Sequence, residues 1–373
     1  MTLMKLKGAV AALALLPAMA QAENYTAAVT WNDLHAITMN HFVNFAKYVK
    51  DATNGEINFE VYTNSSLLPP RSALKGTADG IAQYSHVTGA YVPADLPLDN
   101  VLNDIAFNAD DQLAVTFAQT EMKALHPKMQ AEYKKNGVVF SASYSTNPYL
   151  YICATPIRTV EDLKGKKIRT GSTAQVNWVK ATGGTAVSVP ATEMYTGLQR
   201  GSVDCALGDA TFMTTSFKLQ EVAKASTTLG LGTHTSGGNF FNADFWQSIT
   251  PEQRRVLLDQ ASQTFVELAI DWKNRGDEAL AEAKSNGVEI IEPDETLKAA
   301  LADFRADLAK TMPKVAMEER KVEDPTDLLD AYAAAVDKYK SLLEGVDRTD
   351  AAALRKIADA EIYSKIDVTT YGM

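Results

Sequence analysis

Arg169 is the residue whose type and position most clearly suggest binding chemistry. It ends a short apolar strand expected over residues 166–169, directly before the glycine loop Thr170-Gly171-Ser172. A guanidinium at a strand end offers a planar fork of donors that pairs bidentately with a carboxylate or sulfonate and does not lose its charge. The alternative is a surface arginine beside the basic run 164–167, and these residues alone do not decide between the two.

No group of residues in the sequence points to catalysis. The metalloprotease motif His-Glu-x-x-His, the nucleophile elbow Gly-x-Ser-x-Gly, the Walker loop and the dinucleotide-binding Gly-x-Gly-x-x-Gly are all absent. The five histidines are scattered, which disfavours a metal site. We therefore expect a protein that is not an enzyme and that uses no cofactor and no metal.

Length and charge narrow the possible partners. The 373 residues suggest two domains, and 36 basic against 46 acidic residues give a formal charge of −10. No basic cluster is longer than the run 164–167, so binding to nucleic acid is not expected.

The first 22 residues have the three parts of a secretory signal. Lys5 and Lys7 precede the apolar run 8–16, and Ala20-Gln21-Ala22 places small residues before a cleavage site after Ala22. A membrane anchor is the alternative, but the apolar run is shorter than the about 20 residues that cross a bilayer. We expect a soluble protein outside the cytoplasm.

Strands and helices alternate along the chain, which is typical of α/β folds with largely parallel sheets. A first set of units begins with strands expected at 25–31, 57–62 and 81–85, and a second set begins near 149–154. Ligands of such open sheets lie beyond the carboxyl ends of the strands. Trp31 and His86 are expected there, after the first and third strands.

Beyond the second set, residues 251–286 predict one long helix, with Thr250 as its N-cap and Pro251 at its first position. Two α/β lobes joined by more than one crossing strand can capture a ligand by closing on it, although fold alone does not set function.

Several motifs around Arg169 identify a family resemblance. The chain is similar to the solute-binding proteins of tripartite ATP-independent periplasmic (TRAP) transporters, of the C4-dicarboxylate-binding type. The matching positions are Asp162-Leu163-Lys164-Gly165 followed by Lys167-Ile168-Arg169, then Glu193, Tyr195, Leu198, Gln199, Gly201 and Asp204, and finally Asn242, Trp246, Ile249, Pro251 and Gln253.

The resemblance implies a two-lobed periplasmic binding protein with hinge strands and a long helix across both lobes. On this basis residues 1–22 are the signal peptide, 23–150 the first α/β lobe (completed by about 236–252), 151–235 the second lobe, and 253–373 the long spanning helix with C-terminal helices packing on both lobes. The family's function implies a periplasmic, monomeric receptor that binds a small organic anion between the lobes. It would deliver this anion to the permease subunits of a TRAP transporter. A secreted enzyme or a ligand sensor on the same scaffold is the alternative.

Within this family, Arg169 matches the arginine that pairs with the ligand carboxylate. The chain departs from the sialic-acid-binding members, because its entry strand into the second lobe has no second arginine and Ala191 replaces a phenylalanine. Asp209 follows the strand near 204–207 and either contacts the ligand or caps the helix that begins near Thr211. The candidate ligand-binding residues are Arg169, Asp209, Tyr151, Tyr149, Trp31, His86, Asn239 and Phe212.

The ligand expected from one cation, several aromatic residues and Ala191 is a monocarboxylate or sulfonate with an apolar or aromatic body. Whether Cys153 and Cys205 form a disulfide stays open, although an oxidising compartment permits the bond.

Overall fold

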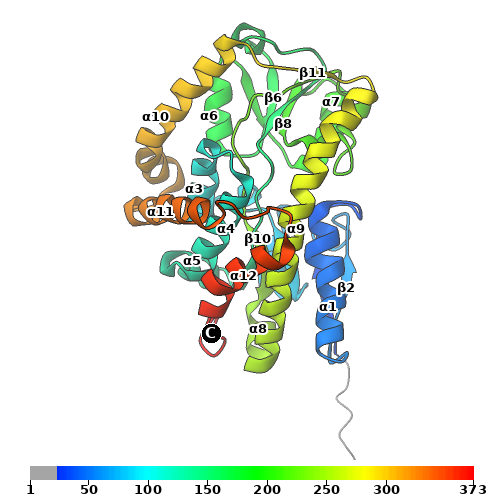
Figure 1. Cartoon of the computed structure of the whole chain (residues 1–373), viewed down its shortest axis with the longest axis vertical. Coiled ribbons are helices and arrows are strands. Elements are labelled where there is room, and N and C mark those ends of the chain that lie inside the picture. The colour runs from blue at the N-terminus through cyan, green and yellow to red at the C-terminus, as the bar shows by residue number, and fades with distance from the viewer. Residues whose placement is uncertain (1–22) are drawn as a thin grey trace, which may run out of the picture.

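Two separate β-sheets form the centres of two lobes in residues 23–373, the part of the chain that this computed structural model describes (Figure 1). The leader expected at 1–22 lies outside the described residues. The first sheet has the order β2 (Ile57–Tyr62), β1 (Glu23–Ala28), β3 (Tyr84–Val87), β10 (Gly238–Asn242), β4 (Val138–Ala142). The second has the order β11 (Glu289–Ile291), β9 (Ala225–Thr227), β5 (Leu150–Cys153), β8 (Cys205–Gly208), β6 (Lys167–Thr170), β7 (Thr185–Ser188). The predicted two-lobed α/β class is confirmed.

Both sheets are mixed, which corrects the expectation of largely parallel sheets. β10 runs antiparallel to β3 and β4, and β5 runs antiparallel to β8 and β9. Each of these two strands follows a segment that crosses between the lobes. They therefore enter their sheets from the cleft side, whereas the neighbouring strands end there.

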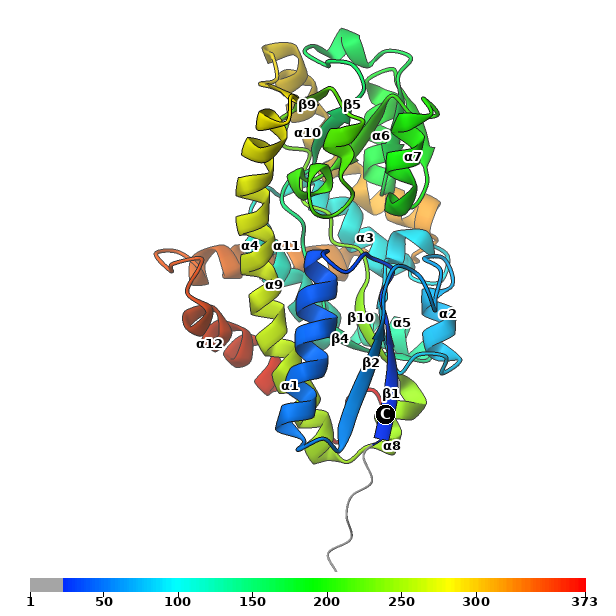
Figure 2. The ribbon, with the colours of Figure 1, turned by 90° about the vertical axis from the view of Figure 1, so that its right-hand side faces the viewer.

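The long helix α9 (Pro251–Ser285) runs along both lobes (Figure 2). It contacts helix α1 (Phe45–Ala52) and β4 in the first lobe, and β11 and the 3-10 turn η6 (Ala210–Met213) in the second. Its start is fixed by the predicted cap, because the Thr250 side chain accepts from the Gln253 amide and the Gln253 side chain accepts from the Thr250 amide. One rigid element thus supports both walls of the cleft.

Shorter helices cover the two sheets. Those of the first lobe are α2 (Ala73–Ala78), α3 (Pro97–Ile105), α4 (Gln112–Leu125), α5 (Pro127–Lys135) and α8 (Ala243–Ser248), and those of the second are α6 (Thr173–Ala181) and α7 (Met194–Gln199). Within residues 23–373, no helix has both the length and the apolar character needed to cross a membrane.

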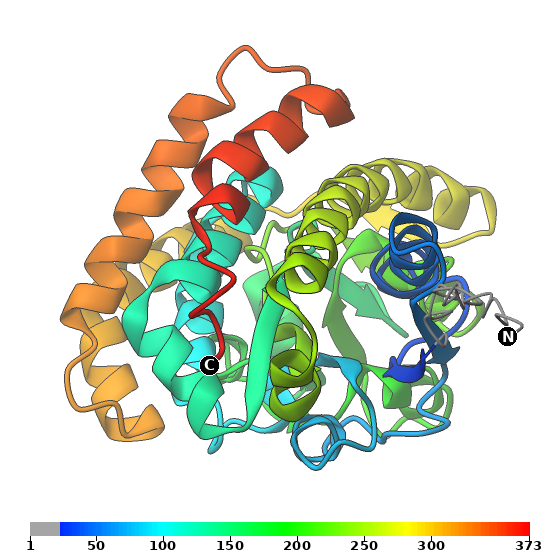
Figure 3. The same cartoon turned by 90° about the horizontal axis from the view of Figure 1, so that it is seen from below.

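Three C-terminal helices pack around this framework: α10 (Glu295–Arg320), α11 (Thr326–Leu342) and α12 (Ala351–Glu361). α10 contacts α6 in the second lobe and α3 in the first, while α11 packs on α4 and α12 on α9. Seen from below, α11 and α12 lie on one side of the molecule, with the C-terminus beside the first lobe (Figure 3).

Two local elements differ from the sequence-based expectation. The third strand is β3, Tyr84–Val87, so His86 lies within the strand and pairs with Asn239 of β10 instead of following the strand end. A π-helical stretch, η1 (Thr38–Asn44), leads directly into α1 and is a feature that the sequence did not predict. Single π-helical turns of this kind are frequent near functional sites.

The two cysteines are joined in the structure. Cys153 of β5 and Cys205 of β8 are directly opposite each other in the antiparallel pair, with Cα atoms 4.1 Å apart, and form a disulfide. The bond closes a loop that contains β6, β7, α6 and α7, the part of the second lobe that carries Arg169. The sequence did not decide whether the two cysteines form a disulfide. The register of β5 against β8 places them opposite each other, and they do.

The two crossing segments, residues 143–149 and 228–237, are bound to each other and to the first lobe. The Tyr149 amide donates to the Gly232 carbonyl at 2.8 Å, and the Thr146 amide donates to the His234 carbonyl at 3.0 Å. At their first-lobe end, Gly237 has φ +72°, and a Cβ there would lie 1.9 Å from the Val87 oxygen. Glycine is therefore required at this position.

A fully buried ion pair holds the same glycine. Lys123 of α4 lies 3.0 Å from Asp99 of α3, and both side chains have no exposed surface. Lys123 also donates to the Gly237 carbonyl at 2.7 Å, while the Gly237 amide donates to Asp99 at 2.7 Å. The pair therefore fixes the point at which the second crossing segment enters β10.

Replacing Lys123 by methionine should lower the free energy of unfolding by about 3–5 kcal/mol, because the substitution leaves the Asp99 charge buried without its partner. Chemical denaturation measures the change. The control is Lys47→Met, which removes an exposed i,i+4 pair with Asp51 and should cost less than about 1 kcal/mol. Equal losses in the two variants would contradict the role given to the buried pair.

Candidate functional site

A small cavity of about 20 Å³ lies between the closed lobes. All but one of the side chains around it belong to buried residues, and Phe217 is partly exposed. This volume is far below the roughly 300–1,000 Å³ of small-molecule sites, so a ligand enters only when the lobes or the lining side chains move apart. The lining residues are Trp31, His35, Ile37, Thr88 and Tyr91 of the first lobe, Tyr144, Thr146, Tyr149 and His234 of the crossing segments, Arg169, Ala191, Phe212 and Phe217 of the second lobe, and Trp272 of α9.

Arg169 brings the cavity its positive charge. Its backbone lies in β6 between β7 and β8, and only 2% of the residue is exposed. The guanidinium donates through Nε to the Val189 carbonyl at 3.0 Å and through Nη1 to the Leu207 carbonyl at 3.4 Å. No carboxylate of the described residues forms an ion pair with it. Burying a charge without an opposite charge beside it is costly, so buried charges in proteins are usually paired. A buried guanidinium that contacts only carbonyl groups should therefore bind an anion strongly.

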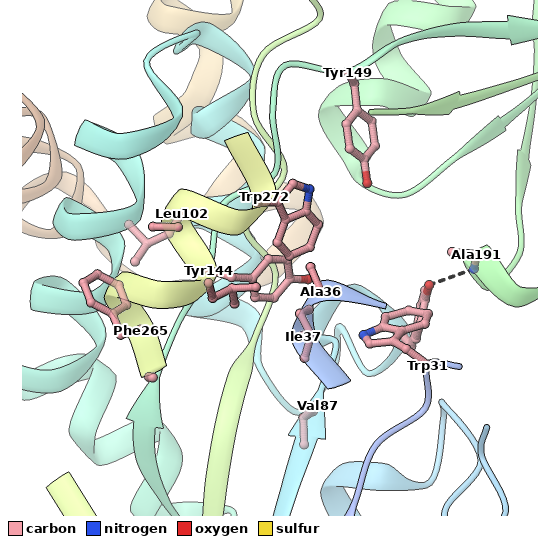
Figure 4. Packing of buried hydrophobic residues seen from close by; sticks show 14 of the residues in the cluster. Trp31, Ala36, Ile37, Val87, Leu102, Tyr144, Tyr149, Ala191, Phe265 and Trp272 are labelled. Atoms are coloured by element: carbon pink, nitrogen blue, oxygen red, sulfur yellow. Dashed lines mark hydrogen bonds between the residues drawn. The ribbon is translucent and has the colours of Figure 1, made fainter. Parts of the chain in front are cut away.

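Aromatic rings form most of the remaining wall (Figure 4). Trp272 stacks on Tyr144 with ring centres 5.4 Å apart, and Tyr149 stacks on His234 at 5.3 Å. In the figure, the Tyr149 hydroxyl points into the space between Trp272 and Ala191. Trp31 Nε1 and His234 Nδ1 are buried without a hydrogen-bond partner in the structure. The cavity therefore combines flat apolar surfaces with a few free polar atoms.

His86 and Asn239 lie beneath the cavity and support its wall. The Asn239 amide group donates to His41 Nδ1 at 2.5 Å, and its oxygen lies 3.0 Å from His86 Nδ1. The His86 ring packs against Trp31 and Tyr144, both of which line the cavity. Asn239 and His86 thus do not reach the cavity, because they bond to each other across the β3–β10 pair.

Burial keeps the side chains of His86 and His41 neutral. It lowers the pKa of His86 to about 4 and the pKa of His41 to about 3, with the mutual repulsion of the rings as a further cause for His41. A neutral His41 can accept through Nδ1 from the Asn239 amide group, whereas a protonated ring could not. The wall beneath Trp31 thus depends on uncharged imidazoles.

Acid should weaken the fold through these rings. Between pH 6.5 and about 4, the unfolded chain binds a proton at His86 that the folded chain does not, so the free energy of unfolding falls as the pH falls. His86→Gln removes this titrating group. The free energy of unfolding of the variant should therefore change less steeply with pH, by up to about 1.4 kcal/mol per pH unit. Denaturant titrations at several pH values measure both slopes.

The buried acids do not affect this comparison. Burial raises the pKa of Asp209 to about 6 and that of Glu132 to about 8, which gives stability changes of the opposite sign, but both acids are present in wild type and variant. The control is His126→Gln at a partly exposed position, which should alter the slope less. Parallel curves for wild type and His86→Gln would contradict the prediction.

Asp209 is turned away from the cavity. One of its carboxylate oxygens accepts from the Thr211 amide at 2.8 Å and the Thr211 hydroxyl at 2.6 Å, so it caps η6. The other oxygen accepts from Trp272 Nε1 at 3.2 Å. Of the two roles that the sequence left open, the structure has the cap, and the same side chain connects the second lobe to α9.

The other second-lobe candidates divide in the same way. Tyr149 and Phe212 line the cavity. Tyr151 does not, because its hydroxyl accepts from Trp178 Nε1 of α6 at 2.7 Å inside the second lobe. The structure thus brings together Arg169, Tyr149, Trp31 and Phe212, and it places Asp209, Tyr151, His86 and Asn239 outside the cavity wall.

Several lining residues were not among the sequence-based candidates, including Tyr91, Tyr144, His234 and Trp272. Tyr144 and His234 lie on the crossing segments, and the run Thr233-His234-Thr235-Ser236 between two strands was an available signal of an irregular connection. Trp272 lies in the middle of a uniform helical pattern, which carried no such signal.

Direct contacts between the lobes show that the cleft is closed. The Ala191 amide donates to the Tyr91 hydroxyl at 2.8 Å, which is the dashed line at Ala191 in Figure 4, and the Asn32 side chain donates to the Ser216 carbonyl. At the outer edge, Asp104 of α3 accepts from the Ala174 amide of α6 at 3.0 Å.

The family comparison agrees with this architecture. Residues 28–316 match the model of bacterial extracellular solute-binding protein, family 7. The ectoine-binding periplasmic protein TeaA of Halomonas elongata is 25% identical over 307 residues, which are 81% of this chain and 86% of that protein. A solute-binding protein of Albidiferax ferrireducens is 28% identical over 188 residues, which span half of this chain and about half (54%) of that relative.

Solved structures share the fold. A TRAP periplasmic solute-binding protein of Bordetella bronchiseptica with bound mandelate has a TM-score of 0.74 at 20% identity, covering 86% of this chain and 99% of that one. One of Desulfovibrio salexigens with bound orotic acid also has a TM-score of 0.74 at 20% identity, covering 85% and 99%. With two lobes, a closed cavity between them and a family match over most of its length, the chain belongs to family 7 of the bacterial extracellular solute-binding proteins.

Proposed function

We propose that this receptor captures a small organic anion in the closed cavity, with Arg169 pairing the carboxylate or sulfonate. The observation that carries the proposal is the buried guanidinium without an acidic partner among the described residues. Nη2 makes no hydrogen bond to the protein, so the fork keeps a donor for a ligand. Asp209 brings no competing charge into the cavity, because its oxygens serve η6 and Trp272.

The cavity favours a monocarboxylate or monosulfonate with an apolar or aromatic body. One cation is matched by one anionic group, and the stacked rings of Tyr144, Trp272 and Tyr149 offer flat apolar surface. Ala191 is the smallest side chain that the second lobe contributes to the wall. Mandelate and orotic acid, the ligands bound to the two solved relatives, are compact acids of this kind.

We propose that the receptor delivers its ligand to the permease subunits of a TRAP secondary transporter, and membership of family 7 supports this proposal. The proposal places the protein in the periplasm after cleavage behind Ala22, as a monomer that does not turn its ligand over. Closure follows the general scheme in which ligand contacts to both lobes favour the closed form.

Arg169→Met should weaken binding of the anion by about 2–5 kcal/mol, roughly 30- to 5000-fold in Kd, because the ligand charge loses its partner in a desolvated cavity. Isothermal titration calorimetry with mandelate, orotate, pyroglutamate, benzoate and benzenesulfonate measures the change.

Arg200→Met is the matched control, because Arg200 is an exposed arginine of the same lobe and its loss should leave Kd unchanged. An acid that binds wild type and Arg169→Met equally well would contradict the role of Arg169. Mass spectrometry of the recovered acid after incubation tests the absence of turnover, and a converted product would favour an enzyme.

A further inference from the structure

Three helices from different parts of the chain meet at the outer edge of the cleft (Figure 1). They are α3 of the first lobe, α6 of the second lobe and α10, and each of them contacts the other two. α6 begins at Thr173, directly after the loop 170–172 that follows Arg169. The start of α6 and the guanidinium of the cavity therefore belong to one short segment of the second lobe.

A buried carboxylate of the first lobe lies against the start of α6. Asp104, in the last turn of α3, has no exposed side-chain surface. Its Oδ1 accepts from the amide of Ala174, which belongs to the opposite lobe, at 3.0 Å. The first amides of a helix have no partner within the helix and carry partial positive charge, so they favour a negative charge beside them. The closed cleft thus gives Asp104 a favourable contact that an open cleft would break.

Arg320, the last residue of α10, binds both sides of this contact. It donates through Nε and Nη2 to Oδ2 of Asp104 at 3.1 and 2.7 Å, and through Nη2 to the Thr173 hydroxyl at 2.5 Å. α10 is itself attached to the first lobe, because its Arg305 makes a bidentate pair with Asp110 at 2.9 and 2.7 Å. The bond from Arg320 to Thr173 therefore crosses between the lobes.

The contact extends to Arg169 through the loop that precedes α6. The Gln175 side chain of α6 accepts from the Gly171 amide at 2.7 Å, which joins the loop to the helix. A Cβ at Gly171 would lie 3.4 Å from Arg169 Nη1, so the loop also packs on the guanidinium. Fixing the start of α6 against the first lobe therefore also fixes the position of Arg169.

We propose that Asp104 and Arg320 are positioning residues that keep the cleft closed around the bound anion without touching it. The inference rests on the proposed function, in which a ligand binds by drawing the two lobes together. Neither residue lines the cavity, and the other direct contacts between the lobes described above, those of Tyr91 and Asn32, involve neutral groups. A contact present only in the closed form shifts the closing equilibrium by the same factor for every ligand. Arg169 thus selects the ligand, whereas Asp104 and Arg320 determine how long it is retained.

Two variants test this role. Asp104→Asn combined with Arg320→Gln removes both charges, so that neither is left buried without a partner. Thr173→Val keeps the ion pair and removes only its bond to the second lobe. In calorimetry with mandelate, orotate and benzenesulfonate, the double variant should raise Kd about tenfold or more, the effect of one charge-assisted hydrogen bond, and Thr173→Val should raise it less.

The factor should be equal for the three acids, because the contact acts on closure and not on the ligand. Stopped-flow measurements should find the change in koff, since release requires the cleft to open, whereas entry into an open cleft does not need the contact. A factor that differs from acid to acid would show that Asp104 or Arg320 acts on the ligand directly, and it would overturn the positioning role.

Hydrogen–deuterium exchange of the ligand-free protein gives a readout that needs no ligand. The amides at the start of α6 have no acceptor within the helix, so their protection depends on Asp104. The peptide that spans residues 170–176 should therefore exchange faster in the double variant than in wild type.

The matched control is Asp111→Asn with Arg348→Gln. This pair has contacts of 2.7 and 2.8 Å and joins α4 to the connection between α11 and α12, so its loss should leave Kd, koff and the exchange at 170–176 unchanged. If wild type and the double variant bind the acids with equal Kd and koff, the positioning role is wrong and the proposed function stands. If no acid binds wild type, the proposed function is wrong, and unchanged exchange at 170–176 would then overturn the contact between the lobes as well.

Discussion

The burial of one guanidinium without a carboxylate partner is the constraint on which this structure depends. Transferring an ion from water into a protein interior costs several kcal/mol unless it is paired and hydrogen-bonded. Arg169 receives two carbonyl contacts and no ion pair within the described residues. The nearby Asp209 is held by η6 and Trp272, and the surrounding aromatic rings supply no negative charge. The cavity is thus arranged so that an anion from outside completes the pairing.

The rest of the fold positions that charge against the opposite lobe. Two crossing segments carry Tyr144, Tyr149 and His234 to the cavity, and the Asp99–Lys123 pair fixes the second of them through both backbone groups of Gly237. The helix α9 spans the lobes and adds Trp272. Buried polar groups that are fully bonded hold a unique geometry, and here they are concentrated where the chain passes between lobes. The connection between the lobes is therefore short and well defined.

The sequence predicted the lobes, the long helix with its cap and the cavity position of Arg169, because each follows from local pattern or from a contiguous motif. The sequence was a poorer guide to which of the candidate residues reach the cavity in the folded chain. Tyr149 and Tyr151 are two positions apart at the start of β5, yet only Tyr149 reaches the cavity. The hydroxyl of Tyr151 instead accepts a hydrogen bond from Trp178 inside the second lobe. Asn239 and His86 are at plausible positions but bond to each other. Tyr91 and Trp272 enter the wall through packing between elements far apart in sequence, which no local pattern encodes.

Two of the four tryptophans, Trp31 and Trp272, lie in the cavity wall, while Trp178 and Trp246 are buried elsewhere. Indole emission responds to the polarity and charge of its surroundings, and both wall indoles lie in the space that a bound solute and its displaced water would share. The molecule therefore carries its own optical probe of occupancy, one from the first lobe and one from the helix that joins the halves.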